Sequence, residues 1–150
     1  MAEFYVSLNE REMARQIADM INQHNRWVTR FSADSILLTA ARYFVEIEGH
    51  KVVGCASNIK EYDNISKIQH ICVLPSHRRL AIGRKLTELA IANSPTEYVY
   101  MNIREDNIAS LGLAGILGFR YATKHWFRDH WTLTFSRRRN VEFQNQISVC

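Results

Sequence analysis

The sequence has few of the residues that interrupt, crosslink or anchor a chain. Its 150 residues include only 3 cysteines, 2 prolines and 6 glycines. The cysteines Cys55, Cys72 and Cys150 are odd in number and widely spaced, so we expect neither a disulfide framework nor a zinc site. Two of them lie in strand-like apolar segments. We therefore expect buried free thiols and, from them, a reducing, cytoplasmic location.

Long apolar runs are also missing. No segment approaches the length of a membrane span, and residues 1–5 lack the basic-then-apolar order of a signal peptide. We find no internal repeat and no low-complexity segment. With 47% hydrophobic and 23% charged residues, the composition is that of an ordinary soluble, single-domain protein without a membrane partner.

The most informative segment joins a strand to a helix through a basic turn. The apolar strand Ile68–Leu74 must end at Pro75, because proline has no N–H for the strand ladder. The amphipathic helix Ile82–Ala92 follows within a few residues. Small side chains at Ala81 and Gly83 leave room for an anion at the unpaired N–H groups that open the helix.

Positive charge surrounds the same turn. The cations there are Arg78, Arg79, Arg84 and Lys85. Guanidinium and ammonium groups strengthen anion binding at a helix N-terminus, where the helix dipole already favours negative charge. The segment therefore predicts a pyrophosphate-binding turn over Leu80–Lys85. An arginine-rich surface turn without a ligand is the alternative interpretation.

At these residues the chain resembles the GCN5-related N-acetyltransferase (GNAT) superfamily. The signature of that family is Gln or Arg, two residues, Gly, one residue, then Gly or Ala. It is read here as Arg78–Gly83 and is preceded by the usual Val-x-Pro at Val73–Pro75. Ala81 stands where the first glycine is usual. An alanine costs little there if the backbone is right-handed, but it is strained if the backbone needs a positive φ.

A second segment, Asn107–Phe119, resembles the other characteristic segment of the family, in which an asparagine opens a helix that ends in Gly-Phe. The residues agree with this reading. Asp106 or Asn107 can cap the helix start, Gly118 can end the helix in a left-handed conformation, and Phe119 can anchor the next strand. The order and separation of the two segments match the family, and the resemblance covers roughly residues 1 to 135.

The resemblance implies an α/β (α+β) fold with a central twisted mixed sheet of six to seven strands and helices on both faces. Sequence patterns provide these elements. The expected strands are Glu3–Leu8, Tyr43–Glu48, Lys51–Lys60, Lys67–Leu74, Tyr98–Ile103, Phe119–Thr123 and Trp131–Phe135. The expected helices are Glu10–Asn25, Ser35–Arg42, Ile82–Ala92 and Asn107–Leu117. We expect the domain to span residues 1–135 and a basic C-terminal tail to span residues 136–150.

The resemblance also implies acetyl-CoA as the acyl donor, without a metal, and acetyl transfer to a primary amine of a small molecule or peptide. In the family, the pantetheine arm lies between two parallel strands, here Lys67–Leu74 and Tyr98–Ile103. The residues implied in cofactor binding are Ile71, Cys72 and Val73 through their backbone, Arg78, Arg79, Leu80, Ala81, Ile82, Gly83, Arg84 and Lys85 around the pyrophosphate, and Asn107. Asn107 can equally serve as a plain helix cap.

Attack by an amine on a thioester needs a base, a donor for the oxyanion and a proton for the leaving thiolate. His70 lies on the strand beside the expected thioester, and its ordinary pKa range suits a base; it can also be a packed strand residue. Glu61 is a rival base. Further carboxylates flank the strands: Asp63, Glu105 and Asp106. Many family members have a proton-donating tyrosine where this chain has Ala114, so the donor stays open.

Two segments are expected to shape the acceptor pocket, Asn25–Ser35 and His125–Trp131. The second is rich in aromatic rings and fits either a flat or cationic acceptor or a hairpin packed at the edge of the core. The net charge of +4 is partly carried by Arg137–Arg139. This leaves an alternative function, a nucleic-acid-associated or CoA-binding protein on the same fold with weak chemistry. A homodimer is also compatible with the sequence.

Overall fold

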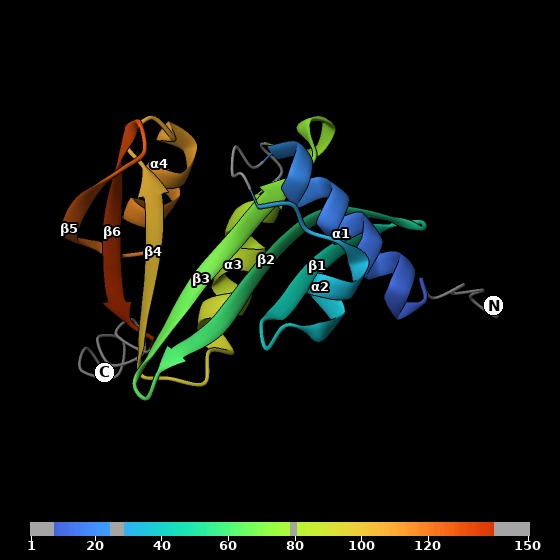
Figure 1. Ribbon diagram of the computed structural model, residues 1–150, viewed down its shortest axis with the longest axis horizontal. Coiled ribbons are helices and arrows are strands. Elements are labelled where there is room, and N and C mark those ends of the chain that lie inside the picture. The colour runs from blue at the N-terminus through green and yellow to red at the C-terminus, as the bar shows by residue number, and fades with distance from the viewer. Residues whose placement is uncertain (1–7, 25–28, 79–80, 140–150) are drawn as a thin grey trace, which may run out of the picture.

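The computed structural model describes residues 8–24, 29–78 and 81–139. Its helices are α1 (Glu10–His24), α2 (Ala33–Leu38), α3 (Ile82–Ala92) and α4 (Ile108–Ile116), with a short 3₁₀ turn, η1 (Pro75–His77). Its strands are β1 (Arg42–Glu48), β2 (Lys51–Tyr62), β3 (Ile65–Val73), β4 (Tyr98–Arg104), β5 (Arg120–Phe127) and β6 (His130–Arg138) (Figure 1). The expected strand Glu3–Leu8 lies almost entirely outside the described residues.

The strands form one mixed sheet in the order β1-β2-β3-β4-β6-β5. Neighbouring strands are antiparallel except β3 and β4, which are parallel and pair only from Ile65–Lys67 to Tyr98–Tyr100. Figure 1 shows these two strands meeting at one end and separating toward the other. The separation opens the middle of the sheet.

A β-bulge in β3 accompanies the separation. Cys72 pairs with Cys55 and Gln69 pairs with Ser57, so β3 has one residue more than β2 between these pairs. Within the bulge, His70 adopts a φ of 55°, which is unusual for a residue other than glycine. A bulge bends its strand and increases the local twist, which turns the end of β3 away from β4.

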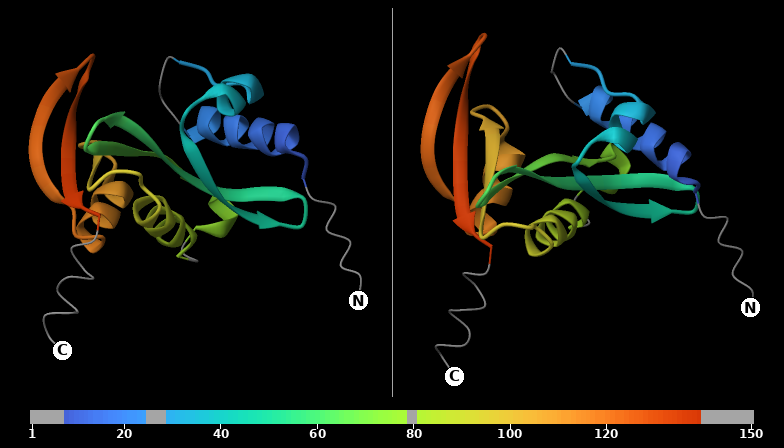
Figure 2. Two further views of the ribbon diagram at one scale, coloured as in Figure 1. Left: turned by 90° about the horizontal axis from the view of Figure 1, so that it is seen from below. Right: turned by 60° about the horizontal axis from the view of Figure 1, so that its bottom comes forward.

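Helices cover both faces of the sheet, which confirms the expected architecture. In Figure 2, α1 and α2 lie on one side of the sheet and α3 and α4 on the other. Each side has its own apolar core. One is built around Ile17, Ile21 and Val52, and the other around Leu86, Val99 and Ala114. Burial of these apolar side chains provides most of the force that holds the layers together.

Close packing of α3 requires a glycine on β2 that the sequence did not single out. A Cβ atom on Gly54 would lie 2.8 Å from Cγ2 of Ile82 and 3.1 Å from Cδ1 of Leu86. Real Cβ atoms essentially never show the first distance, and the second is tighter than nine in ten real Cβ contacts. Gly54 therefore sets how closely the first turn of α3 approaches the sheet.

The second helix is shorter and begins earlier than expected. The prediction of Ser35–Arg42 is wrong at both ends, because the helix spans Ala33–Leu38. Ser32 starts it through a capping box with Ser35, in which each side chain bonds the backbone N–H of the other. Thr39 ends it in an extended conformation, and the following residues enter β1.

The last two strands are longer than the expected Phe119–Thr123 and Trp131–Phe135. β5 and β6 join through a tight turn at residues 128–129, and β6 continues to Arg138. Three arginines at the end of β6 contact the body of the protein. Arg137 and Arg139 donate to the backbone carbonyls of Leu117 and Ser94, near the ends of α4 and α3. These arginines therefore satisfy carbonyls at helix ends.

Candidate active site

A cavity of about 950 Å³ occupies the opening between β3 and β4. Its walls come from the bulged part of β3 (68–72), from β4 (101–104) and the start of α4, from the end of α1 and from the β5–β6 turn (127–130). Polar and apolar groups line it in similar measure. A cavity of this size and mixed lining is typical of a small-molecule site.

The wall from β3 offers the extended backbone that the resemblance assigns to the pantetheine arm. Ile71 and Cys72 line the cavity. Beyond Lys67, the edge of β3 that faces β4 has no strand paired to it in the described structure. Val73 does not line the cavity, and its carbonyl accepts a hydrogen bond from Nε of Arg78 at 3.3 Å. A free strand edge can hydrogen-bond an added strand-like ligand.

The expected pyrophosphate turn enters α3 through a left-handed residue. Ala81 is the N-cap of α3 and adopts φ 59° and ψ 14°. The alanine at the usual glycine position is therefore strained. A Cβ on Gly83 would lie 3.4 Å from Cγ2 of Val73, so a bulky side chain there meets the strand. Arg79 and Leu80 lie outside the described residues.

The remaining cations expected at this turn have partners within the protein. Arg84 pairs with Glu88 at 3.0 Å, and Lys85 pairs with Glu46 at 3.1 Å. These pairs are exposed, and exposed ion pairs contribute little to stability, so a phosphate can compete for either cation.

Asn107 performs the capping role that the sequence indicated. Its side-chain oxygen accepts a hydrogen bond from the backbone N–H of Ser110 at 3.1 Å. It also lines the cavity. The amide nitrogen of the same side chain can still donate to a ligand, so the two roles are compatible.

His70 lines the cavity but is held by aromatic neighbours. Its Nδ1 lies 2.8 Å from the hydroxyl of Tyr43, and its ring meets the ring of Phe31 edge to face, with centroids 4.9 Å apart. Burial is the main cause that lowers the pKa of His70 to about 4. The imidazole is therefore neutral at physiological pH and is a weaker base than its ordinary pKa range suggested.

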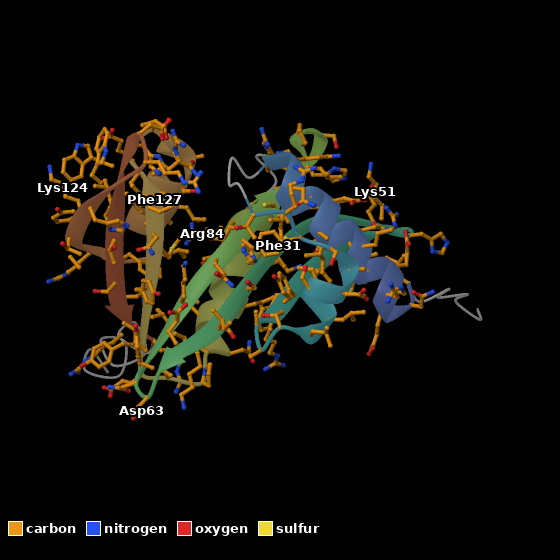
Figure 3. The ribbon with its side chains drawn as sticks, in the orientation of Figure 1. Phe31, Lys51, Asp63, Arg84, Lys124 and Phe127 are labelled. Atoms are coloured by element: carbon orange, nitrogen blue, oxygen red, sulfur yellow. The ribbon has the colours of Figure 1, made fainter. Side chains whose placement is uncertain are left out.

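The structure separates Glu61 from the cavity. Glu61 is exposed near the tip of the β2–β3 hairpin, where β3 and β4 are still paired. Burial of the ring, and secondarily the charge of Glu61, raise the pKa of Tyr100 to about 12. Asp63, at the tip itself, lies at the bottom in the view of Figure 3, well below Phe127. Asp106 does line the cavity, and its carboxylate accepts from Arg104.

No described tyrosine lines the cavity. Ala114, at the position of the usual tyrosine, is fully buried in the core beneath α4. Tyr98, Tyr100 and Tyr121 lie elsewhere in the sheet. Ser110 is the hydroxyl of α4 that does line the cavity.

The segment His125–Trp131 forms a hairpin, and only its turn reaches the cavity. His125 and Trp126 are exposed on β5, whereas Phe127 and His130 line the cavity. Nδ1 of His130 lies 2.9 Å from a carboxylate oxygen of Asp129. From the sequence, this segment was open to two interpretations, a pocket wall or a hairpin packed at the edge of the core, and Asp129 and His130 did not stand out from their neighbours.

His24 is a lining residue that the sequence analysis missed. It ends α1, immediately before the expected acceptor segment, and that position was the only signal in the sequence. Burial, and secondarily the charge of Arg78, lower the pKa of His24. In the expected acceptor segment Asn25–Ser35, Thr29 lines the cavity and residues 25–28 lie outside the described part.

A mixed sheet that opens between two parallel strands, beside the N-termini of two helices, defines an acetyltransferase class of α/β protein. The chain belongs to the acetyltransferase (GNAT) family, whose model matches residues 3–119. No curated protein matches the sequence at a significant level. The family assignment predicted from the two motifs is therefore confirmed.

Solved structures share the fold at low sequence identity. A putative acetyltransferase, yncA of Salmonella typhimurium, solved with acetyl-CoA, is 18% identical with a TM-score of 0.71, over 87% of this chain and 91% of the other. A spermidine N-acetyltransferase (SpeG) mutant from Vibrio cholerae is 18% identical with a TM-score of 0.75, over 91% and 94%. The ribosomal-protein-S18-alanine N-acetyltransferase of Escherichia coli is 16% identical with a TM-score of 0.69, over 83% and 86%.

Two further findings concern the described residues alone. They contain no cluster of three or more histidine, cysteine, aspartate or glutamate side chains arranged to hold a metal ion. None of their helices has the length and apolar character needed to cross a membrane.

Proposed function

We propose that the protein is an acetyl-CoA-dependent N-acetyltransferase that acetylates a primary amine of a small molecule or peptide. The observation that carries the proposal is the cavity where β3 leaves β4, because it is lined by an edge of β3 that pairs with no described strand and by residues at the N-terminus of α4. Membership of the acetyltransferase family and the acetyl-CoA bound in the Salmonella structure support this donor.

The residues present fit such a donor. Ile71 and Cys72 line the cavity, and an extended pantetheine arm can pair with this stretch of β3 as an added strand. The first turn of α3 has no side-chain cap at Ala81 in the described structure, so its N–H groups suit the pyrophosphate, and Arg84 and Lys85 lie in the same turn. Bound there, acetyl-CoA supplies the activated acetyl group, and the protein orients it and excludes water.

The acceptor is assigned to the part of the cavity between Thr29 and the β5–β6 turn. These segments belong to connections, whose sequences vary more among related proteins than the strands that they join. Relatives of the same fold carry names as different as spermidine N-acetyltransferase and ribosomal-protein-S18-alanine N-acetyltransferase. Both names describe amine acceptors, which supports an amine here without selecting one.

The nucleic-acid alternative has less support from the structure. Arg137 and Arg139 donate to backbone carbonyls of the protein itself, and Arg138 contacts the hydroxyl of Tyr98 at 3.2 Å. Cations used in this way offer less charge to a phosphate backbone. A binding titration against DNA and RNA at two salt concentrations tests the alternative, because phosphate contacts weaken steeply with salt.

The test of the proposed function is thiol release from acetyl-CoA in the presence of polyamines, aminoglycosides, amino acids, and peptides with free N-termini. We expect acetyl-CoA to bind in calorimetry and one amine class to release thiol with formation of its acetyl amide. Replacing Gly83 with a bulky residue, or Arg78 with alanine, should weaken acetyl-CoA binding by about 1–3 kcal/mol. Absence of acetyl-CoA binding in the wild type would refute the proposal.

A further inference from the structure

Asp129 and His130 form a carboxylate–imidazole pair at the β5–β6 turn, where the turn meets the cavity. The His130 side chain is only 9% exposed, and its Nδ1 lies 2.9 Å from Oδ1 of the exposed Asp129. Its other ring nitrogen, Nε2, is buried and has no hydrogen-bond partner among the described residues. A buried histidine with one nitrogen held and the other free is the arrangement of an oriented base.

We propose that His130, oriented by Asp129, accepts the proton from the acceptor amine. The inference rests on the proposed N-acetyltransferase function and deepens it by naming the residue that activates the acceptor. His130 is the proton acceptor in this proposal, and Asp129 is a positioning residue that acts through it.

The hydrogen bond to Asp129 fixes which nitrogen of His130 is basic. The bond from His130 lowers the pKa of Asp129, so the carboxyl group is ionised and can only accept. Nδ1 must then donate its proton, and in the neutral ring Nε2 carries the lone pair. An ammonium group that reaches Nε2 supplies the hydrogen bond that this buried atom lacks.

The other two histidines of the cavity are less suited to the role. The guanidinium of Arg78 approaches Nδ1 of His24 at 3.4 Å, and a guanidinium can only donate, so the proton of His24 resides on Nε2. His70 has a pKa of about 4, which makes it a weak base. Of the three, His130 alone has its lone pair directed by a carboxylate.

A buried hydroxyl and an aromatic ring lie close to His130. Thr132, two residues along β6 and on the same face, has a buried hydroxyl that also lacks a partner among the described residues. Phe127 lies across the turn, with its ring centroid 5.9 Å from that of His130. Arg128, between the two, adopts a φ of 58°. Strained turns that hold buried polar groups are common at functional sites.

The ammonium form of the acceptor gives one proton to Nε2 of His130. The neutral amine attacks the thioester carbonyl carbon, a C–N bond forms, the C–S bond breaks, and CoA leaves as its thiolate. The attacking nitrogen loses its second proton to solvent, and His130 returns its proton to the thiolate. The products are the acetyl amide, CoA with a free thiol and one released proton.

The experiment compares the wild type with His130→Gln, Asp129→Asn and the control His50→Gln, which changes an exposed histidine at the β1–β2 turn. All four should bind acetyl-CoA equally in calorimetry, which shows that the fold and the donor site are intact. With the best amine of the panel, His130→Gln should lower kcat by about a hundredfold or more. Added imidazole should restore part of the loss, and His50→Gln should match the wild type.

The nucleophile provides a second readout that a structural role would not change. Hydroxylamine is largely neutral at the assay pH, so its attack needs no proton acceptor beforehand. The rate with hydroxylamine should fall much less in His130→Gln than the rate with the ammonium acceptor. Equal losses with both nucleophiles, or wild-type kcat in His130→Gln, would overturn the proposal.

Nuclear magnetic resonance of ¹⁵N-labelled histidine tests the inference without any acceptor. We expect His130 of the wild type to carry its proton on Nδ1, and we expect Asp129→Asn to lose this preference. A proton on Nε2 in the wild type would refute the role of His130 even if the enzyme acetylates amines. An enzyme that binds acetyl-CoA but acetylates no amine would instead count against the proposed function.

Discussion

The hydroxyl of Tyr43 lies 2.8 Å from Nδ1 of His70, and the two rings stack with centroids 5.9 Å apart. The contact connects β1 to the bulge of β3 across the intervening strand β2. Burial raises the pKa of Tyr43, so the phenol keeps its proton and can donate to the neutral imidazole. The pair thus supports His70 in the left-handed conformation at the point where the sheet opens.

This environment predicts a pH-dependent stability. The pKa of His70 is about 4 in the folded protein, against an ordinary value near 6.5, so the unfolded chain binds a proton more readily. The free energy of unfolding should therefore fall as the pH drops from about 7 toward 4, by on the order of 2 kcal/mol from this residue. His70→Asn should remove this part of the pH dependence, because asparagine has no titrating ring. Asparagine also tolerates the left-handed backbone at this position.

Urea unfolding of both proteins at neutral pH and at about pH 4.5 measures the difference. Carboxylates contribute to acid destabilisation in both proteins. Only the difference between the two proteins in the slope of unfolding free energy against pH therefore tests His70. The control His50→Asn changes an exposed histidine and should keep the wild-type slope. Identical slopes in the wild type and His70→Asn would contradict the prediction.

Ala81 predicts a stabilising substitution. Its φ of 59° is costly for alanine and free for glycine. Ala81→Gly should raise the free energy of unfolding by up to about 1 kcal/mol, after the greater entropy of glycine in the unfolded chain is subtracted. It should also tighten acetyl-CoA binding, since the turn would reach its bound conformation with less strain.

Thermal unfolding and calorimetry measure the two effects. The matched control is Ala109→Gly, on an exposed position in the first turn of α4, where the same change should lower stability by about 0.5–1 kcal/mol. A loss of stability in both variants would show that the left-handed conformation at Ala81 carries no strain.

Gly54 predicts a destabilising substitution at the contact between β2 and α3. The methyl group of Gly54→Ala would meet Ile82 and Leu86 at distances that the helix must relieve by moving outward. We expect the free energy of unfolding to fall by about 1–3 kcal/mol. Acetyl-CoA binding should weaken as well, because the first turn of α3 moves when the helix moves outward.

The double variant Gly54→Ala with Ile82→Ala removes the closest opposing atom and should recover part of the binding loss. Gly112→Ala is the control, since a Cβ at Gly112 meets nothing within 4 Å and alanine favours a helix. An unchanged denaturation midpoint for Gly54→Ala would show that α3 is not tightly packed there.

The sequence allowed the sheet, most helices and the family to be predicted because local signals coincide with the fold. Pro75 follows the end of β3, Asn107 caps α4, and Gly118 ends the turn after it with a φ of 77°. The prediction of the second helix was wrong because Ser32 and Ser35 can both start a helix, and the hydrophobic pattern does not distinguish them.

The site was predicted less completely because its geometry depends on contacts that are distant in sequence. The pKa of His70 follows from burial, and the bulge that places it has no glycine to mark it. Gly54 reads as an ordinary strand residue in the sequence, because the need for a glycine there follows only from the packing of α3 against β2. The pairing of Asp129 with His130 is local, but nothing in the sequence says that the turn faces the cavity.

The last prediction concerns Cys55 and Cys72, which face each other across β2 and β3. From sequence we expect both to be reduced and structural. Cys55 donates its thiol proton to the backbone carbonyl of His70. The neighbouring thiol of Cys55 lowers the pKa of Cys72, whereas Cys72 and burial raise the pKa of Cys55. Cys55 is fully buried, whereas Cys72 lines the cavity.

Iodoacetamide should therefore label Cys72 faster than Cys55, because the thiolate is the reactive form and needs access. Saturating acetyl-CoA should protect Cys72, since the donor is proposed to lie against the same stretch of β3. Mass spectrometry after incubation with acetyl-CoA should find no stoichiometric acetyl group on either thiol, and Cys72→Ser should keep its acetyl transfer. Labelling of Cys72 at an unchanged rate with acetyl-CoA bound would show that the donor does not lie against β3. An acetylated Cys72 that passes its acetyl group to the amine would replace direct attack with a covalent route.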